Sequence, residues 1–138
     1  MKVLYIYCNE FGYKPTIKTL EQFPDYKETE TKTFYDVQVA FIHAEEKDMQ
    51  AEYDLFKKLV NNIKWICRKN NTKKIILHSF AHLSESKASS EFTFDLFNRL
   101  ENRLKSSNYE VYQTPFGYFL DLYIKAPGFS LARVFQDL

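Results

Sequence analysis

The chain has 138 residues, of which 45% are hydrophobic and 27% are charged, and its formal net charge is +1. This length predicts one globular domain, and a total charge so close to zero gives no basis for assigning nucleic-acid binding. The sequence contains neither a membrane-length apolar run nor a signal-peptide cleavage site, and its two cysteines form no disulfide or metal framework, which together predict a cytoplasmic protein.

The first half of the chain predicts two strands separated by a loop. Residues 2–7 (KVLYIY) form a short apolar run typical of a buried strand. Residues 12–32 are polar and contain prolines, which favours an irregular segment. Residues 35–44 (YDVQVAFIHA) alternate in polarity, which predicts a strand with Val37, Val39 and Phe41 on one face and Asp36, Gln38 and Ala40 on the other.

The second half predicts two amphipathic helices among strands. After Met49, apolar residues at steps of three and four predict a helix with the stripe Tyr53, Phe56, Val60, Ile63 and Cys67. A second helix, capped at Ser84 or Ser86, is expected to carry Phe92, Leu96, Leu100 and Leu104. Strands are expected at 75–80, 110–114 and 119–126, the last two joined as a hairpin by the turn PFGY, and the final residues, 130–138, are too few to assign. The predicted fold class is α/β: a single domain with a mixed β-sheet and two main amphipathic helices.

Charge is distributed unevenly along the chain. The segment from Lys57 to Lys74 contains seven basic residues and no acidic one. Such a run is typical of a solvated helix face, and it is also the composition of a phosphate-binding patch. Both interpretations stay open at this point.

The stretch HSFAHLSES, residues 78–86, holds most of the residues with possible chemistry. With His43, the histidines His78 and His82 are enough in number for a zinc site, but a His-x-x-x-His pair points one way only on a helix, and here a strand is predicted. Ser79 or Ser84 with His82 as a base lacks the glycine-flanked turn of a nucleophile elbow. Cys8 fits a small buried hydrophobe better than a nucleophile.

Several motifs in order resemble the archaeal-type editing domain of threonyl-tRNA synthetase. They are SFAHLS (79–84), LFNRLENRLKSSNYEV (96–111), TPFGYF (114–119) and KAPGFSLARV (125–134), together with the opening MKVLYIYCNEFGY and the strand VQVAFIHAEE. The similarity spans nearly the whole chain, and the combination of FAHLS with PFGY is its most specific part.

The resemblance implies a D-aminoacyl-tRNA deacylase-like fold over residues 1–138 and a proofreading reaction. Domains of this family hydrolyse the ester of serine mischarged on threonine tRNA, with a ribose hydroxyl of the terminal adenosine assisting the attacking water, so no metal or other cofactor is expected. The implied partners are tRNA, a synthetase catalytic domain in cis or in trans, and a second copy of the chain in a homodimer. A catalytically inactive tRNA-binding or dimerisation module and a D-aminoacyl-tRNA deacylase are the alternatives.

The resemblance also implies the site residues. His82 matches the catalytic-site histidine of the family, whereas His43 and His78 have no counterpart and are expected to be structural or exposed. The substrate-binding positions are Ala40, Phe41, Ala44, Phe80, Ala81, Phe116, Gly117, Tyr118, Phe119 and Leu120. The chain departs from the family in having Leu120 in place of a catalytic-site lysine, Phe119 in place of a tyrosine and Arg133 in place of a pocket glutamate. We expect Arg133 to supply the lost positive charge and to act as the second catalytic residue.

Overall fold

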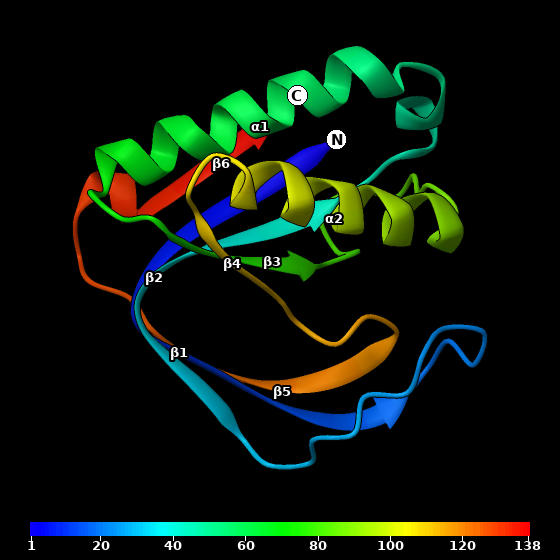
Figure 1. The fold of residues 1–138 in the computed structure, drawn as a ribbon, viewed down its shortest axis with the longest axis horizontal. Coiled ribbons are helices and arrows are strands. Elements are labelled where there is room, and N and C mark those ends of the chain that lie inside the picture. The colour runs from blue at the N-terminus through cyan, green and yellow to red at the C-terminus, as the bar shows by residue number, and fades with distance from the viewer.

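Two helices cover one face of a six-stranded sheet in the computed structural model, which describes residues 1–138 (Figure 1). The strands are β1 (Lys2–Lys18), β2 (Lys32–His43), β3 (Lys74–Ser79), β4 (Glu110–Gln113), β5 (Tyr118–Lys125) and β6 (Arg133–Asp137). The helices are α1 (Glu52–Lys69) and α2 (Ser90–Lys105), with short 3-10 helices η1 (Glu46–Gln50) and η2 (Ser130–Ala132). The predicted single α/β domain with a mixed sheet is confirmed. No helix is both long and apolar enough to cross a membrane.

The sheet is organised around the long strand β1. Its strand order is β4-β3-β2-β1-β5, and β6 also pairs with β1. The β2–β3 and β3–β4 pairs are parallel, and every pair that includes β1 is antiparallel. The first part of β1 pairs with β6, from Lys2 opposite Asp137 to Ile6 opposite Arg133, and its second part pairs with β5.

The sheet bends where β1 and β2 both change the face that they bury. Cys8 is paired with Val37 and Phe11 with Phe34. All four side chains belong to one apolar cluster, although the two residues on each strand are three positions apart and would face opposite sides of a regular pleat. Asp36, between the two pairs, has a φ of 52°, a left-handed conformation that interrupts the pleat. Figure 1 shows the result: β5 and the second half of β1 curve away from the helices.

The bend divides the core in two. The larger cluster lies between the sheet and the helices and includes Tyr5, Ala40, Leu59, Leu77 and Leu100. The smaller cluster lies on the concave face, where Val37, Val39 and Phe41 meet residues from both edges of the sheet, Tyr112 of β4 and Leu120 and Leu122 of β5. From Val37 onward β2 is therefore buried on both faces, with Ala40 in the larger cluster and Val37, Val39 and Phe41 in the smaller one, whereas Asp36 is exposed.

Both helices lie where the sequence predicts them, with changes in detail. In α1 the buried side chains are Leu55, Leu59, Val60, Ile63, Ile66 and Cys67, whereas Tyr53 is 82% exposed, so the predicted stripe was wrong at its first position. The cap of α2 is Ser89, whose hydroxyl accepts a hydrogen bond from the Phe92 amide at 3.2 Å. The predicted caps Ser84 and Ser86 were wrong, because both serines hold the preceding loop instead.

Two further predictions were wrong. Residues 12–18, assigned to a loop, continue β1 as far as Lys18. Pro15 has no amide hydrogen for a strand partner. It is tolerated because it lies beyond Tyr13, the last residue of β1 that pairs with β2, and next to a shift in the register between β1 and β5. The predicted hairpin does not form either, since β4 pairs with β3 at one edge of the sheet and β5 pairs with β1 at the other.

Candidate functional site

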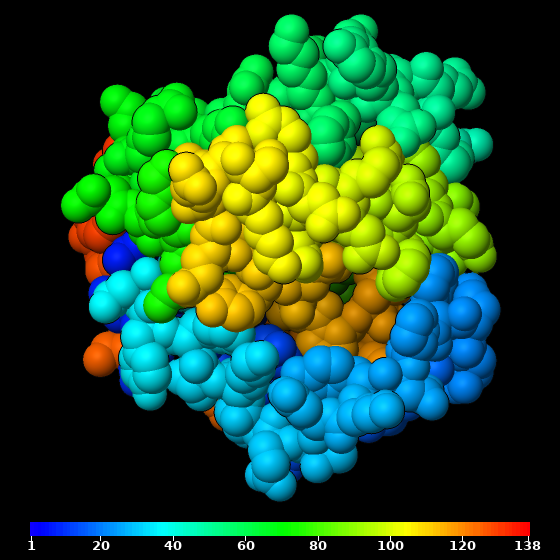
Figure 2. Space-filling view, viewed as in Figure 1, coloured from blue at the N-terminus to red at the C-terminus, as the bar shows by residue number.

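Two adjoining hollows lie between the end of β3, the start of α2 and the segment that leads into β5. Figure 2 shows the depression between α2 and the blue segment near residues 19–26, with residues around 115–122 in its floor. The first hollow has a volume of about 260 Å³ and is lined by Thr19, Leu20, His78, Ser79, Phe80, Ala81, His82, Thr114, Pro115, Phe116, Gly117, Tyr118, Phe119, Leu120 and Leu122. The second has about 330 Å³ and is lined by Thr19, Leu20, Ile42, His43, Ala44, Ser79, Ala81, Lys87, Ala88, Ser90, Thr93 and Phe116. The hollows share five residues, so they form one continuous site.

One wall of the site is the segment of residues 79–86, held from below by the buried His43. The Leu83 amide donates to His43 Nδ1 at 3.0 Å, so this nitrogen is the acceptor. Nε2 therefore carries the proton and donates to the Ser86 carbonyl at 2.7 Å. One neutral imidazole thus fixes two points of a loop that has no regular secondary structure.

Glu45 holds the same loop through a buried ionic network. Its carboxylate accepts from the Ser84 hydroxyl at 2.7 Å and from the Met1 ammonium at 2.9 Å. Asp48 accepts from that ammonium at 3.0 Å. Burial alone would raise the pKa of Glu45, but the hydrogen bonds from the ammonium and from Ser84 outweigh it and hold that pKa at about 2. The charged carboxylate is therefore part of the folded loop.

The opposite wall is the turn before β5, held by aromatic packing and by backbone contacts. The Phe116 ring lies 4.9 Å from Phe23 and 5.4 Å from Phe94 of α2, measured between centroids. The Gly117 carbonyl accepts from the Thr19 amide at 2.7 Å, which ties the turn to the end of β1. Gly117 has a φ of 81°, and a Cβ at this position would lie 3.0 Å from the Leu20 Cβ. The turn therefore requires glycine.

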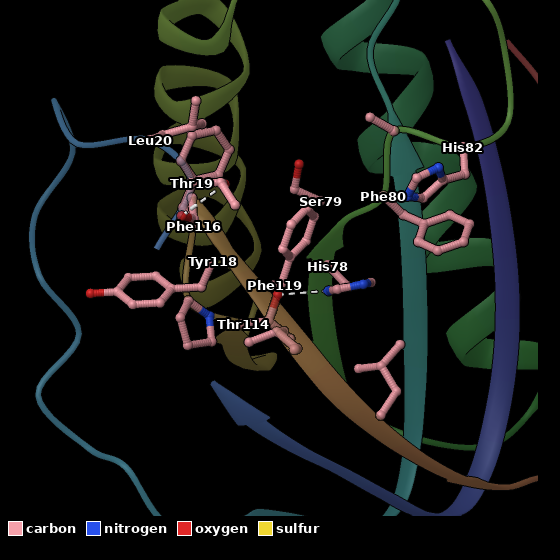
Figure 3. A pocket seen from close by; sticks show the side chains of 15 residues that line it. Thr19, Leu20, His78, Ser79, Phe80, His82, Thr114, Phe116, Tyr118 and Phe119 are labelled. Atoms are coloured by element: carbon pink, nitrogen blue, oxygen red, sulfur yellow. Dashed lines mark hydrogen bonds between the residues drawn. The ribbon is translucent and has the colours of Figure 1, made fainter. Parts of the chain in front are cut away.

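His78 joins the two walls across the floor of the first hollow, as Figure 3 shows. Its Nδ1 lies 2.8 Å from the Thr114 hydroxyl. Burial, with a smaller effect of the neighbouring His82, lowers the pKa of His78 to about 4, so the ring is neutral at physiological pH. His82 is exposed, and its ring packs edge-on against Phe80 with a centroid distance of 5.0 Å. Among the histidines of the first hollow, His82 is thus the one accessible to a ligand.

Comparison with known proteins identifies the family. Residues 1–138 match the archaea-specific editing domain of threonyl-tRNA synthetase. The chain belongs to this family. Such an editing domain is an aminoacyl-tRNA deacylase, so the site described above lies in a domain of that enzyme class.

The curated relatives are full-length synthetases. The chain is 27% identical to threonine–tRNA ligase of Nitrosopumilus maritimus over 96% of its own length and 21% of the relative's. It is 30% identical to the ligase of Staphylothermus marinus over 100% of its length and 22% of the relative's. The chain thus spans about a fifth of the length of these relatives.

A solved structure confirms the fold. The structure titled c-Myc DNA Unwinding Element Binding Protein superposes with a TM-score of 0.74, covering 100% of this chain and 99% of its own, at 11% sequence identity. The similarity shows that the two chains share the same α/β fold.

The fold brings most of the predicted editing-site residues together. Eight of them line the first hollow: Phe80, Ala81, His82, Phe116, Gly117, Tyr118, Phe119 and Leu120. Ala44 lines the second hollow. Phe41 lies underneath, where its ring packs edge-on against Phe80 at 5.2 Å.

Two predicted residues lie elsewhere. Ala40 points into the core between the sheet and the helices, because it is on the opposite face of β2 from Phe41. Arg133 starts β6 and is exposed, its guanidinium donates to the Pro127 carbonyl at 3.0 Å, and it lines neither hollow. The structure therefore offers no geometry in which Arg133 replaces the lysine of the family at Leu120.

Sequence reasoning missed several residues that line these hollows. Thr19 and Leu20 lie in the segment assigned to a loop, and nothing in their surroundings indicates a pocket. Pro115 is the first residue of the PFGY turn and Thr114 directly precedes it, so their proximity in sequence was an available signal. His43 and His78, expected to be structural or exposed, are buried and hydrogen-bonded, and each also lines a hollow.

Other candidate chemistry is not assembled. No group of three or more histidine, cysteine or acidic side chains is arranged to hold a metal ion. Cys8 is fully buried, and its burial, only partly offset by Arg133, raises the pKa of the thiol to about 12, as expected for an inert core residue. The basic run from Lys57 to Lys74 lies along α1 and the turn that connects α1 to β3. None of its side chains lines either hollow.

Proposed function

We propose that this editing domain hydrolyses the ester bond of serine mischarged on threonine tRNA. The observation that carries the proposal is the joined pair of hollows. One end has the accessible His82 and the aromatic residues of the PFGY turn, and the other has walls of small side chains, Ala44, Ala81 and Ala88. A seryl ester of adenosine has two parts of this character, a flat nucleoside and a small polar acyl group.

The small walls support a sieve. A synthetic site made for threonine cannot strongly reject serine, because one methyl group contributes only about 1–3 kcal/mol to discrimination. A second site too narrow for threonine removes the error without attacking the correct product. Here the threonine methyl would meet the wall formed by Phe80, Ala81 and Ala44.

The chemistry of the proposal needs no protein nucleophile. A ribose hydroxyl of the substrate assists the attacking water, and His82 is placed to donate or accept a hydrogen bond at the open side of the hollow. Backbone amides at the edge of the hollow would stabilise the developing oxyanion, the type of interaction that contributes about 3–4 kcal/mol per donor in acyl transfer. The Phe80 amide is not one of these donors, because it donates to the Ile42 carbonyl at 3.0 Å. Leu120 contributes an apolar contact in place of a charge.

The test is ester loss from seryl- and threonyl-tRNA of the threonine acceptor. We expect serine to be released about 10- to 100-fold faster than threonine. Ala44→Val should slow serine release by narrowing the hollow, and Ala126→Val, which lines neither hollow, is the matched control. Equal rates for both esters, unchanged by Ala44→Val, would contradict the sieve.

One observation favours a second function. The family has a lysine at the position of Leu120 and a glutamate at that of Arg133, and neither position places a charged side chain in the hollows of this chain. Leu120 is apolar and Arg133 lies outside. An inactive tRNA-binding or dimerisation module would bind tRNA and leave both L-esters intact. Release of D-aminoacyl esters with no release of L-serine would instead identify a D-aminoacyl-tRNA deacylase.

The relatives support a proposal for the partners and the location. We propose that the domain acts in the cytoplasm on tRNA, either as the first part of a longer threonine–tRNA ligase or beside one. A homodimer is supported by exposed large apolar side chains on and between β5 and β6, namely Phe119, Tyr123, Ile124, Phe129 and Phe135. A solution mass equal to one 16.5 kDa chain would contradict the dimer.

A further inference from the structure

Lys87 is the single Asp, Glu, Lys or Arg among all the residues that line the two hollows. Apart from it, the lining consists of apolar side chains, hydroxyl groups, backbone and the three histidines. Lys87 belongs to the second hollow, where the deeper residues Ile42, His43 and Ala44 are buried while Lys87 itself is exposed. The charge is therefore at the rim and not on the floor.

The backbone on both sides of Lys87 is fixed. The Ser86 carbonyl accepts from His43 and the Ser86 hydroxyl accepts from the Glu46 amide at 3.0 Å. On the other side, the Ala88 amide donates to the Ala44 carbonyl at 3.0 Å. The start of the lysine side chain is thus held at one place although the residue lies in a loop.

The ammonium group of Lys87 is not used within the chain. The lysines that form ion pairs are Lys2, Lys18, Lys47, Lys74, Lys105 and Lys125. Lys87 is not among them, and it makes no side-chain hydrogen bond. A free cation at the rim of an otherwise uncharged site is available for an anion of the ligand.

We propose that Lys87 binds the phosphodiester group that precedes the terminal nucleoside of an aminoacylated RNA. This inference rests on the proposed function. The ester itself is neutral, and the amino group of the aminoacyl part is cationic and would be repelled by lysine. The nearest formal anion of such a substrate is the phosphodiester on the 5′ side of the terminal ribose. The same ribose carries the acyl ester, so with the acyl group in the second hollow this phosphate is the anion nearest to the rim at Lys87. Lys87 thus contributes to substrate binding and not to the ester chemistry.

The experiment compares two substrates that differ in this phosphate. Seryl-tRNA carries it, and 3′-seryl-adenosine has the same ester and no phosphate. Lys87→Ala should raise KM for seryl-tRNA about 3- to 10-fold with kcat unchanged, leave seryl-adenosine hydrolysis unchanged, and reduce the slope of log binding constant against log salt by about 1. Lys87→Arg should retain the wild-type values. Lys14→Ala removes an exposed lysine that lines neither hollow and should change none of them.

Each other outcome overturns a defined statement. Equal loss of activity on both substrates would place Lys87 at the ester and overturn the phosphate contact, as would no change on either. If wild type hydrolyses neither substrate, the proposed function fails. The salt slopes of tRNA binding by wild type and by Lys87→Ala then still decide whether the contact exists.

Discussion

The two walls of the site are held by different forces. The wall of residues 79–86 is fixed by buried hydrogen bonds and charges, through His43 and Glu45. The wall of residues 114–120 is fixed mainly by packed rings, together with hydrogen bonds in which the Gly117 carbonyl accepts from the Thr19 amide and the Phe119 carbonyl accepts from the Thr16 hydroxyl. A polar network loses much when one member is removed, because a buried partner is left unsatisfied, whereas an aromatic cluster shares its stabilisation among many contacts. The polar wall should therefore respond more to single substitutions and to pH.

The largest effect is expected for His43→Ala, which removes the central residue of the polar wall. It leaves the Leu83 amide and the Ser86 carbonyl without their partner, and each buried unsatisfied group costs about 1–3 kcal/mol. We expect the free energy of unfolding to fall by about 2–4 kcal/mol and deacylation to fall with it, measured by denaturant unfolding and by ester release.

Arg133→Ala is the matched comparison for His43→Ala. Arg133 is exposed and outside both hollows, so we expect less than about 0.5 kcal/mol of change in stability and no change in deacylation. A larger loss of deacylation in Arg133→Ala than in His43→Ala would restore the catalytic role that the sequence suggested for Arg133.

The next effect concerns Glu45 and pH. Its pKa is about 2 in the folded chain against 4.5 without its partners, so its contribution to stability is complete above pH 4.5 and disappears as the pH falls from about 4.5 towards 2. Glu45→Gln should cost about 1–3 kcal/mol at pH 7 and should flatten the acid limb of stability against pH. Thermal unfolding from pH 7 to pH 2 measures both.

The control for Glu45→Gln is the neighbouring Glu46→Gln. The Glu46 side chain is exposed and forms no ion pair, so its substitution should leave the acid limb as it is in wild type. An acid limb of equal steepness in wild type and Glu45→Gln would show that other carboxylates govern acid unfolding.

The smallest effect is expected in the aromatic wall, for Gly117→Ala. The added Cβ meets Leu20 at 3.0 Å on a backbone of positive φ, which costs about 1–2 kcal/mol. The turn should shift away from Leu20 and weaken substrate binding, seen as a higher KM. Gly128→Ala is the control, because a Cβ there has no atom within 4 Å. Equal KM values in wild type and Gly117→Ala would show that the aromatic rings alone position the turn.

The sequence predicted the elements better than their pairing. The strands at β2, β3 and β5 and both helices follow from local periodicity, which depends on residues a few positions apart. The partners of β5 do not, because its pairing with β1 joins residues at least 100 positions apart. The hairpin prediction assumed that consecutive strands pair, and the curled sheet brings β5 back to β1 instead.

The site was predictable where a continuous motif forms one wall. FAHLS and PFGY each lie on one segment, and all of their predicted members line the first hollow: Phe80, Ala81, His82, Phe116, Gly117 and Tyr118. Arg133 was placed by its position in a motif, and sequence order does not reveal that β6 pairs with the first half of β1 while β5 pairs with the second. Lys87 belongs to none of the recognised motifs. Only its place at the rim of the folded second hollow distinguishes it from the other lysines.

The pairing of β1 with β6 sets the order in which the domain can fold. Lys2 lies opposite Asp137, and their side chains meet at 3.1 Å across 135 positions of sequence. Closing so long a loop costs entropy before any contact compensates it, and folds rich in such contacts fold slowly. One edge of β1 therefore stays uncovered on the ribosome until the whole domain has emerged, so the newly made chain has an open strand edge for longer than a fold of local contacts would.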